Sequence, residues 1–257
     1  MILSQIEQRS LETEPYEWSF AGGLFAPEDA TSLIATFPRD HFKTVQGYDG
    51  EKGYEYEARA LINMGAETPA HVESLSAAWR QLAYDLLSPA YRLAIARLVG
   101  RDLTSTPFEA NVFHYGPGAW LGPHVDLKEK ILTHIFYFNE SWNKEDGGSL
   151  AILRSPEMTD AVARVMPVAG NSVLLVRSDK SWHAVAPVAK GCRHSRRSMT
   201  VTFYRPGSVS TLWPPGDTLP LHNYDETSDA KARSEARSGW KRIRSIANKT
   251  SLSWRSR

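Results

Sequence analysis

The chain has 257 residues, a formal net charge of +1, 42% hydrophobic residues and 23% charged residues. These values are typical of a soluble globular protein and give no overall electrostatic attraction to nucleic acids or membranes. No apolar run approaches the roughly 20 residues that span a bilayer, and the N-terminus lacks the basic start and apolar core of a secretory signal. The single cysteine, Cys192, excludes an internal disulfide framework and fits a reducing compartment. We therefore expect a cytoplasmic protein with no membrane partner, in which His, Asp and Glu would hold any metal ion.

The first hundred residues predict mainly helices. Residues 15–25 are predicted to form an extended segment. Pro27, followed by Glu28 and Asp29, marks the start of a helix that ends before Pro38. Residues 39–62 show no clear period and predict a loop, either solvated or able to close over a ligand. Apolar side chains recur at steps of three and four residues over 70–87, which indicates an amphipathic helix. A second helix follows Pro89 and ends at Gly100.

After Leu103 the pattern changes to short apolar or alternating segments separated by Gly, Pro, Asn and Asp. These segments are FEANVFHY, ILTHIFYFN, GGSLAIL, NSVLLV, WHAVAPV and SMTVTFY. Segments of strand length at short spacing are typical of a β-sandwich or barrel. We therefore predict an α+β fold with a mainly β core. Residues 1–104 would form a supporting segment of the same domain, 105–206 the β core and 207–257 a C-terminal extension.

The end of the chain is basic. Residues 229–257 contain nine Lys or Arg residues against Asp229 and Glu235. Such a tail is either a solvated end or a docking arm for a macromolecular partner. Nucleic acid is not an expected partner, although the tail leaves that possibility open, and the sequence does not reveal the oligomeric state.

Three residues form a candidate metal site. His124 and Asp126 are two positions apart, so on an extended segment both side chains point to the same side. His183 follows the apolar segment NSVLLV and would reach the pair from a distant strand. Two imidazoles and one carboxylate can occupy one face of an iron coordination sphere and leave the other positions open, as in mononuclear Fe(II) oxygenases.

Arg196 is the favoured anchor for a dicarboxylate cosubstrate such as 2-oxoglutarate. Arg is the side chain best suited to bind a carboxylate through two parallel hydrogen bonds. With a strand period of two, Arg196 shares one face with Ser198 and Thr200. Arg193 and Arg197 are the alternatives, and strand phase favours Arg196.

These residues together resemble the Fe(II)/2-oxoglutarate-dependent dioxygenases, specifically their prolyl-hydroxylase-like branch. The family pattern appears in order as HYGPGAWLGPHVD, THIFYFN, GGSLAIL, SWHAVAPV and RRSMTVTFY. The resemblance covers roughly residues 108–206. It implies a double-stranded β-helix (jelly roll) that uses Fe(II), 2-oxoglutarate and O2.

The resemblance also implies roles for individual residues. His124, Asp126 and His183 would be catalytic iron ligands, and Arg196 would bind the far carboxylate of 2-oxoglutarate. The other residues implied to contact the cosubstrate are Tyr137, Thr200, Tyr115 and Ser198. His134 and Asn139 are weaker candidates for the same pocket. Related halogenases have Gly or Ala in place of the carboxylate, so Asp126 favours hydroxylation.

The implied function is hydroxylation of an unactivated C–H bond of a small, amino-acid- or peptide-like metabolite, with release of succinate and CO2. One alternative is a prolyl-type hydroxylase of protein residues that docks through its basic tail. Two further alternatives are a non-catalytic cupin-like binding module and a zinc hydrolase that uses the same three ligands. The complete ligand set argues against the binding module, and the zinc hydrolase gives no reason for Arg196 to lie inside the β core.

Overall fold

The computed structural model describes residues 1–48 and 53–225 of the chain. The fold and site described below belong to the compact unit formed by residues 1–224. The predicted basic tail, 229–257, lies outside the described residues. The proposed division at residues 104 and 206 stays a prediction.

Four α-helices occur in the described residues: α1 (Ser4–Glu7), α2 (Pro27–Ala35), α3 (Ala77–Leu87) and α4 (Pro89–Val99). The 3-10 helices are η1 (Val72–Ser74), η2 (Lys144–Asp146) and η3 (Met158–Asp160). The helix predicted over 70–87 starts later than its apolar period suggests, because the side chain of Ser76 accepts a hydrogen bond from the backbone N–H of Trp79 and so caps α3 there. Gly100 ends α4 in the left-handed conformation, at φ 64°. No described helix is long and apolar enough to cross a membrane.

The strands are β1 (Trp18–Ala21), β2 (Lys43–Tyr48), β3 (Gly53–Ile62), β4 (Phe108–Tyr115), β5 (Trp120–His124), β6 (Lys130–Tyr137), β7 (Leu150–Leu153), β8 (Ala161–Val165), β9 (Ser172–Val176), β10 (His183–Val185) and β11 (Arg196–Tyr204). The predicted mainly β core is thus confirmed. The prediction of a loop at 39–62 is wrong for residues 43–48 and 53–62, which form β2 and β3.

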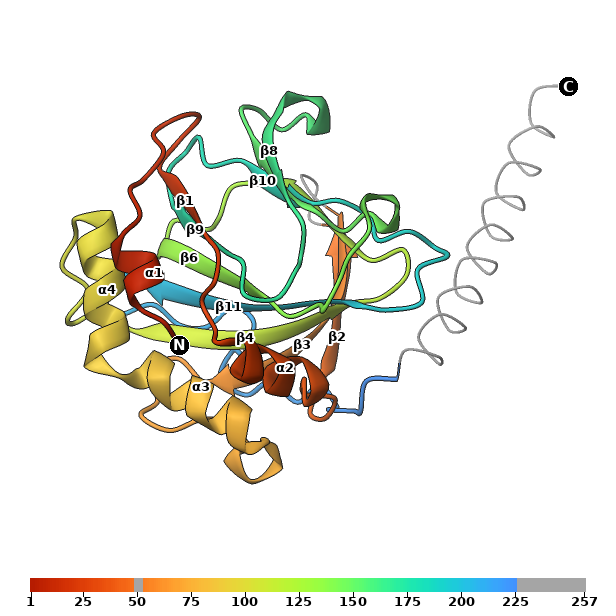
Figure 1. Cartoon of the computed structure of the whole chain (residues 1–257), viewed down its shortest axis with the longest axis horizontal. Helices are drawn as coiled ribbons and strands as arrows, with labels where there is room; N and C mark the ends of the chain where they lie inside the picture. The colour runs from red at the N-terminus through yellow and green to blue at the C-terminus, as the bar shows by residue number, and fades with distance from the viewer. Residues whose placement is uncertain (49–52, 226–257) are drawn as a thin grey trace, which may run out of the picture. The chain divides into compact units, whose positions relative to one another are not determined.

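The described strands form one 11-stranded antiparallel sheet in the order β1-β9-β6-β11-β4-β3-β5-β10-β7-β8, with β2 added beside β3. β3 pairs with β4 through Glu57–Ile62 and with β5 through Tyr54 and Glu55, and the sheet folds back on itself there. In Figure 1, β8 and β10 accordingly lie opposite β11 and β4. The two halves of the sheet thus face each other across an interior.

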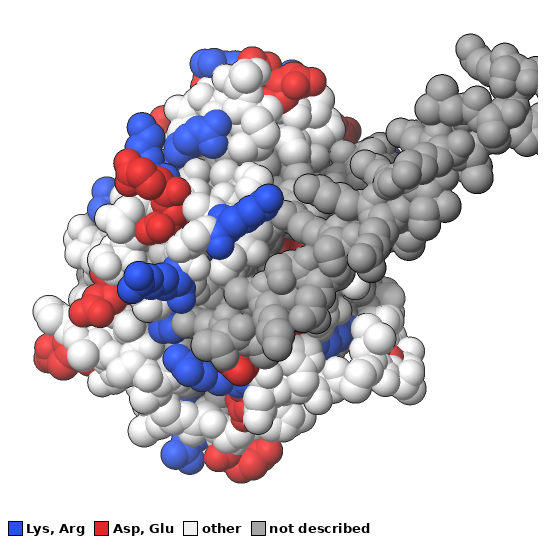
Figure 2. All heavy atoms as spheres, turned by 90° about the vertical axis from the view of Figure 1, so that its right-hand side faces the viewer, with Lys and Arg blue, Asp and Glu red and all other residues white. Residues whose placement is uncertain are grey.

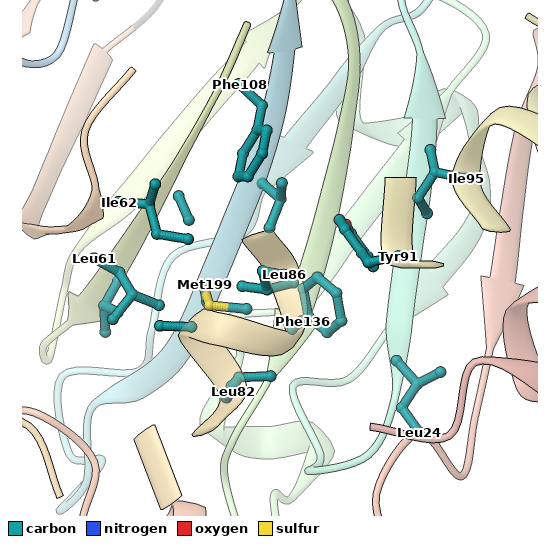
Figure 3. Close-up of a cluster of buried hydrophobic side chains, with 14 of the residues drawn as sticks. Leu24, Leu61, Ile62, Leu82, Leu86, Tyr91, Ile95, Phe108, Phe136 and Met199 are labelled. Carbon is teal, nitrogen blue, oxygen red and sulfur yellow. The ribbon is translucent and has the colours of Figure 1, made fainter. Parts of the chain in front are cut away.

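The strands β4, β6 and β11 alternate between two environments. One face of each strand packs under the helices, where Leu82, Leu86, Tyr91 and Ile95 contact strand residues such as Phe108, Phe136 and Met199 (Figure 3). The other face points to the interior between the sheet halves, where a second core contains Phe113, Ile135, Leu150 and Val185. One side of this interior holds the candidate site.

Charged side chains are mixed on the surface drawn in Figure 2. Lys and Arg lie among Asp and Glu, and no area of a single sign is visible among the described residues on this face. This distribution agrees with the nearly balanced charge of the sequence.

Candidate active site

The three predicted metal ligands come together in the interior. One possible ligand atom from each of His124, Asp126 and His183 lies within 4.8 Å of the others, and all three residues are buried. His124 ends β5 and His183 begins β10, and these residues are direct partners in the antiparallel ladder. Asp126 follows β5 by two residues. The end of β5 and the residues just after it therefore supply two ligands, His124 and Asp126. The pairing of β5 with β10 brings in the third, His183.

Backbone carbonyls fix the orientation of both imidazoles. The Nδ1 atom of His124 lies 2.9 Å from the carbonyl oxygen of Gly122, and that of His183 lies 2.9 Å from the carbonyl oxygen of Ser181. A carbonyl oxygen can only accept, so each Nδ1 carries the proton and donates it. The lone pair of each ring is then on Nε2. This tautomer, held by a backbone acceptor, is the usual form of a metal-binding histidine.

Two donors orient the carboxylate of Asp126. Lys130 Nζ donates to Oδ1 at 2.6 Å, and Thr133 Oγ1 donates to Oδ2 at 2.9 Å. Burial opposes ionisation of Asp126, but the charge of Lys130 and the hydrogen bond that it donates hold the pKa of Asp126 well below its usual range. Each carboxylate oxygen has two acceptor positions, so these bonds leave capacity for a cation. Asp126 is therefore ionised at neutral pH and oriented by its neighbours.

The cavity beside the ligands has a volume of about 420 Å³. Most of the predicted site residues line it, namely Tyr115, His124, Asp126, His183, Arg196, Ser198 and Thr200. Tyr137 does not line the cavity but lies directly behind it, with the Arg196 Cζ atom 5.2 Å from its ring centroid. The strand phase of β11 thus directs Arg196, Ser198 and Thr200 to the cavity.

Arg196 is the cationic group at one end of this cavity. Its side chain is 2% exposed; Nε donates to the Gly148 carbonyl at 2.7 Å and Nη1 donates to Ser198 Oγ at 2.8 Å. No carboxylate among the described residues pairs with it. Arg197, in contrast, lies over the ring of Phe37, and Arg193 is exposed. Of the three candidate arginines, only Arg196 lines the cavity.

Tyr137 also has an unused polar group. Its hydroxyl is fully buried and has no hydrogen-bond partner among the described residues. Burial raises the pKa of Tyr137 to about 12, even though the nearby charge of Arg196 acts to lower it. The hydroxyl therefore stays protonated at neutral pH and can donate. A buried guanidinium and a neutral phenol side by side, without an anionic partner, fit the carboxylate of a ligand.

Two weaker candidates lie elsewhere. His134 faces the helices, and its Nδ1 atom lies 3.0 Å from the hydroxyl of Tyr91. Asn139 donates to the Ser195 carbonyl and accepts from the Arg197 backbone N–H, so it joins two segments of backbone. The expectation that these residues face the pocket is wrong. On β6, His134 is an odd number of residues from Tyr137 and therefore points to the opposite side.

Several cavity residues escaped the sequence analysis. They are Tyr54 and Tyr56 of β3, Glu109 and Asn111 of β4, Lys130 and Thr133 of β6, and Tyr204 of β11. Strand parity could have identified some of them, because Glu109 and Asn111 have the same phase as Tyr115. The β3 residues escaped because their segment was taken for a loop.

The C-terminal segment 207–224 supplies one more wall. Thr211 and Leu212 line the cavity, and Trp213 Nε1 donates to Asn111 Oδ1 at 2.7 Å. Lys43 of β2 holds the segment from the other side: it donates to the Leu212 carbonyl, pairs with Asp217 and lies over the Trp213 ring. Residues far apart in sequence thus fix this wall in place.

Comparison with known proteins agrees with this geometry. Residues 110–204 match the family model of the 2OG-Fe(II) oxygenase superfamily. These residues belong to that superfamily. The protein is therefore an enzyme, an oxygenase of the type that uses Fe(II), 2-oxoglutarate and O2. No curated protein sequence matches the chain.

Solved structures with the same fold include a prolyl-4-hydroxylase from Pseudomonas putida, with a TM-score of 0.52 and 23% identity over 80% of this chain and 100% of that one. An oxidoreductase of the 2OG-Fe(II) oxygenase family from Burkholderia pseudomallei gives a TM-score of 0.52 at 13% identity, over 81% of this chain and 91% of that one. A prolyl hydroxylase from Trichoplax adhaerens, solved with a hypoxia inducible factor peptide fragment, gives 0.51 at 15% identity, over 79% and 87%. At these identities the likeness concerns the fold, and it confirms the double-stranded β-helix of this oxygenase.

Proposed function

We propose that this oxygenase hydroxylates an unactivated C–H bond of a small, amino-acid- or peptide-like metabolite, with release of succinate and CO2. The observation that carries the proposal is the content of one cavity. It joins a cluster of two histidines and an aspartate to a buried arginine that has no carboxylate partner among the described residues. The first feature suits Fe(II), and the second suits the far carboxylate of 2-oxoglutarate.

In this proposal His124, Asp126 and His183 hold the metal. When bound, Fe(II) and 2-oxoglutarate would supply the activation of O2 and the oxidising power of the reaction. The backbone carbonyls of Gly122 and Ser181 keep both imidazoles in the required tautomer. Thr133 fixes the rotation of the Asp126 carboxylate by donating to Oδ2. The chain's own contribution at this end is therefore orientation of the three ligands before the metal arrives.

Arg196 and Tyr137 hold the other end of the cosubstrate. The guanidinium is already positioned by Gly148 and Ser198, so little side-chain entropy is lost when a carboxylate binds. The neutral hydroxyl of Tyr137 adds a second donor. Ser198, Thr200 and Tyr115 complete the same wall. Removal of water from this end strengthens the carboxylate–guanidinium attraction.

The size of the cavity supports a small substrate. A volume of about 420 Å³ is toward the low end of the range of roughly 300–1,000 Å³ for ligand pockets. The same space must accept 2-oxoglutarate as well as the substrate. The alternative, a protein hydroxylase that docks through residues 229–257, depends on a segment outside the described residues.

The decisive experiment is anaerobic. Fe(II) and 2-oxoglutarate are added to metal-free protein, and the weak visible charge-transfer band of their complex is recorded. We expect the band in the wild type, no band in His183→Ala and a weakened band in Arg196→Gln. Absence of the band in the wild type, together with tight binding of zinc, would contradict the proposed cofactor pair. Turnover of small molecules by protein that lacks 229–257 then separates the metabolite hydroxylase from the docking alternative.

A further inference from the structure

The carboxylate of Glu109 is an uncompensated charge inside the cavity. The residue lies on β4, is 2% exposed and lines the cavity. Its Oε1 atom accepts a hydrogen bond from the Tyr204 hydroxyl at 2.7 Å. Its Oε2 atom is buried and has no hydrogen-bond partner among the described residues. A buried carboxylate with only one donor is costly for a fold unless a bound group completes it.

The sheet register places Glu109 near the proposed metal site. Glu109 pairs with Thr202 of β11, and Thr202 pairs in turn with Thr133 of β6, the residue that donates to Asp126. Neighbouring strands are about 4.8 Å apart, so the backbones of Glu109 and Thr133 are separated by roughly 10 Å. A group held by Glu109 can therefore belong to a small molecule that also reaches the metal ligands.

Glu109 lies toward the opposite end of the cavity from the proposed cosubstrate anchor. Its partner Thr202 is six residues from Arg196 along β11, which corresponds to about 20 Å of extended strand. Asn111, two residues from Glu109 on the same strand face, holds Trp213 of the C-terminal segment. The wall formed by that segment therefore covers this end of the cavity.

The permanent cations of the cavity have other partners. Lys130 donates to Asp126 Oδ1, and Arg196 donates to Gly148 and Ser198. Neither forms an ion pair with Glu109 among the described residues. Burial raises the pKa of Tyr204, and the charge of Glu109 raises it further. The one hydrogen-bond partner of Glu109 is thus a neutral hydroxyl, which leaves its negative charge uncompensated.

We propose that Glu109 determines substrate specificity by binding a cationic group, an ammonium or a guanidinium, of the substrate. The inference rests on the proposed function, because it takes this end of the cavity as the substrate end. Oε2 would accept the hydrogen bond from the cation while Oε1 stays bonded to Tyr204. Hydrogen bonds to charged partners favour a cationic ligand over its neutral analogue by a factor of roughly ten to a hundred.

The test compares pairs of probes that differ mainly in charge. L-arginine is compared with L-citrulline and L-lysine with L-norleucine, by calorimetry of metal-free protein and of protein loaded anaerobically with Fe(II) and 2-oxoglutarate. The variants are the wild type, Glu109→Gln and the control Glu57→Gln. Glu57 is also a buried glutamate of the sheet but does not line the cavity. Glu109→Gln retains an acceptor for Tyr204, and its melting temperature reports whether the fold is preserved.

We expect the wild type to bind at least one cation about tenfold or more tightly than its neutral partner. The preference should disappear in Glu109→Gln and persist in Glu57→Gln. If Glu109→Gln does not fold, Glu109→Asp replaces it. The preference for the cation should persist in this variant but weaken, because the carboxylate is retained on a side chain that is shorter by one methylene group.

Two results would overturn the inference. One is a wild type without any preference for the cation, as expected if Lys130 turns to Glu109 in solution. The other is a preference that persists unchanged in Glu109→Gln. The charge-transfer band reports the cofactor pair separately, and the calorimetry of metal-free protein does not depend on that pair. A missing band would thus contradict the proposed function, whereas either of the two calorimetric results above contradicts only the role of Glu109.

Discussion

Replacement of Arg196 is the sharpest perturbation of the proposed cosubstrate site. The guanidinium is 2% exposed and is already held by the Gly148 carbonyl and the Ser198 hydroxyl. In Arg196→Gln a buried carboxylate of 2-oxoglutarate would lose its charged partner. Truncation of one partner of a buried, hydrogen-bonded charge pair costs about 2–5 kcal/mol. This loss corresponds to a dissociation constant for 2-oxoglutarate that is raised about 30-fold to several thousand-fold.

The conservative variant separates charge from geometry. Arg196→Lys keeps the positive charge but lacks the planar fork that binds a carboxylate through two bonds. We expect Arg196→Lys to weaken the binding of 2-oxoglutarate by roughly tenfold, which corresponds to the loss of one hydrogen bond to a charged group. Arg197→Lys is the matched control, because Arg197 is the next residue on β11 but lies over Phe37 on the other face of the sheet.

The assay is an anaerobic titration of Fe(II)-loaded protein with 2-oxoglutarate, followed by the visible band. Circular dichroism and the melting temperature verify that each variant is folded. The assignment of Arg196 is refuted if folded Arg196→Gln binds 2-oxoglutarate within about threefold of the wild type. It is equally refuted if Arg197→Lys loses as much affinity as Arg196→Lys.

Three further predictions concern the metal, acid stability and the cavity wall. His183→Ala should bind Fe(II) at least tenfold more weakly by competition with a chelator and lose turnover, while its circular dichroism is unchanged. Burial lowers the pKa of His134 to about 3, so below pH 6.5 the unfolded chain takes up a proton that the folded chain does not. The free energy of unfolding of the wild type therefore falls as the pH falls. His134→Gln lacks this titrating group, so in urea titrations between pH 6 and 4.5 its free energy of unfolding should decrease less steeply than that of the wild type, by about 1.4 kcal/mol per pH unit. Trp213→Ala removes the hydrogen bond to Asn111 and the contact with Lys43, and should lower the free energy of unfolding by about 1–3 kcal/mol. An unchanged value would mean that the segment 207–224 is held by its other contacts.

Strand phase explains why part of the site could be predicted from sequence. On β11 a period of two places Arg196, Ser198 and Thr200 on one face, and the structure has them on that face. The same rule shows why His134 was misplaced: it cannot share a face with Tyr137 three residues later on a regular strand. Phase alone therefore sorts residues into two sets only within a regular strand: Asn139 has the phase of Tyr137 but lies beyond the end of β6 and does not face the cavity.

Missed strands have local causes. β3 contains the alternation Tyr54, Tyr56, Ala58, but its second half is buried on both faces and no longer alternates. β5 contains Gly122 and Pro123, residues that are depleted in strands. The contact between Lys43 and Asp217 joins positions 174 residues apart, and neither residue carries a signal for the other. Local patterns cannot reveal such long-range pairs.

Assembly of the proposed metal site depends on the register between strands, which strand phase alone does not determine. His124 and His183 are 59 positions apart in the chain, yet they face each other in the ladder of β5 and β10, and their ring centroids are 4.3 Å apart. Their meeting depends on the register between two short strands, and a shift of one residue would turn His183 to the opposite face. The β10–β7 pairing, in which Ala184 opposes Ala151 and Val185 opposes Leu150, fixes that register through buried apolar contacts. A substitution in this pairing would therefore disturb the site by moving a histidine, without removing a ligand atom. The geometry of the proposed metal site thus depends on the packing of β5, β10 and β7.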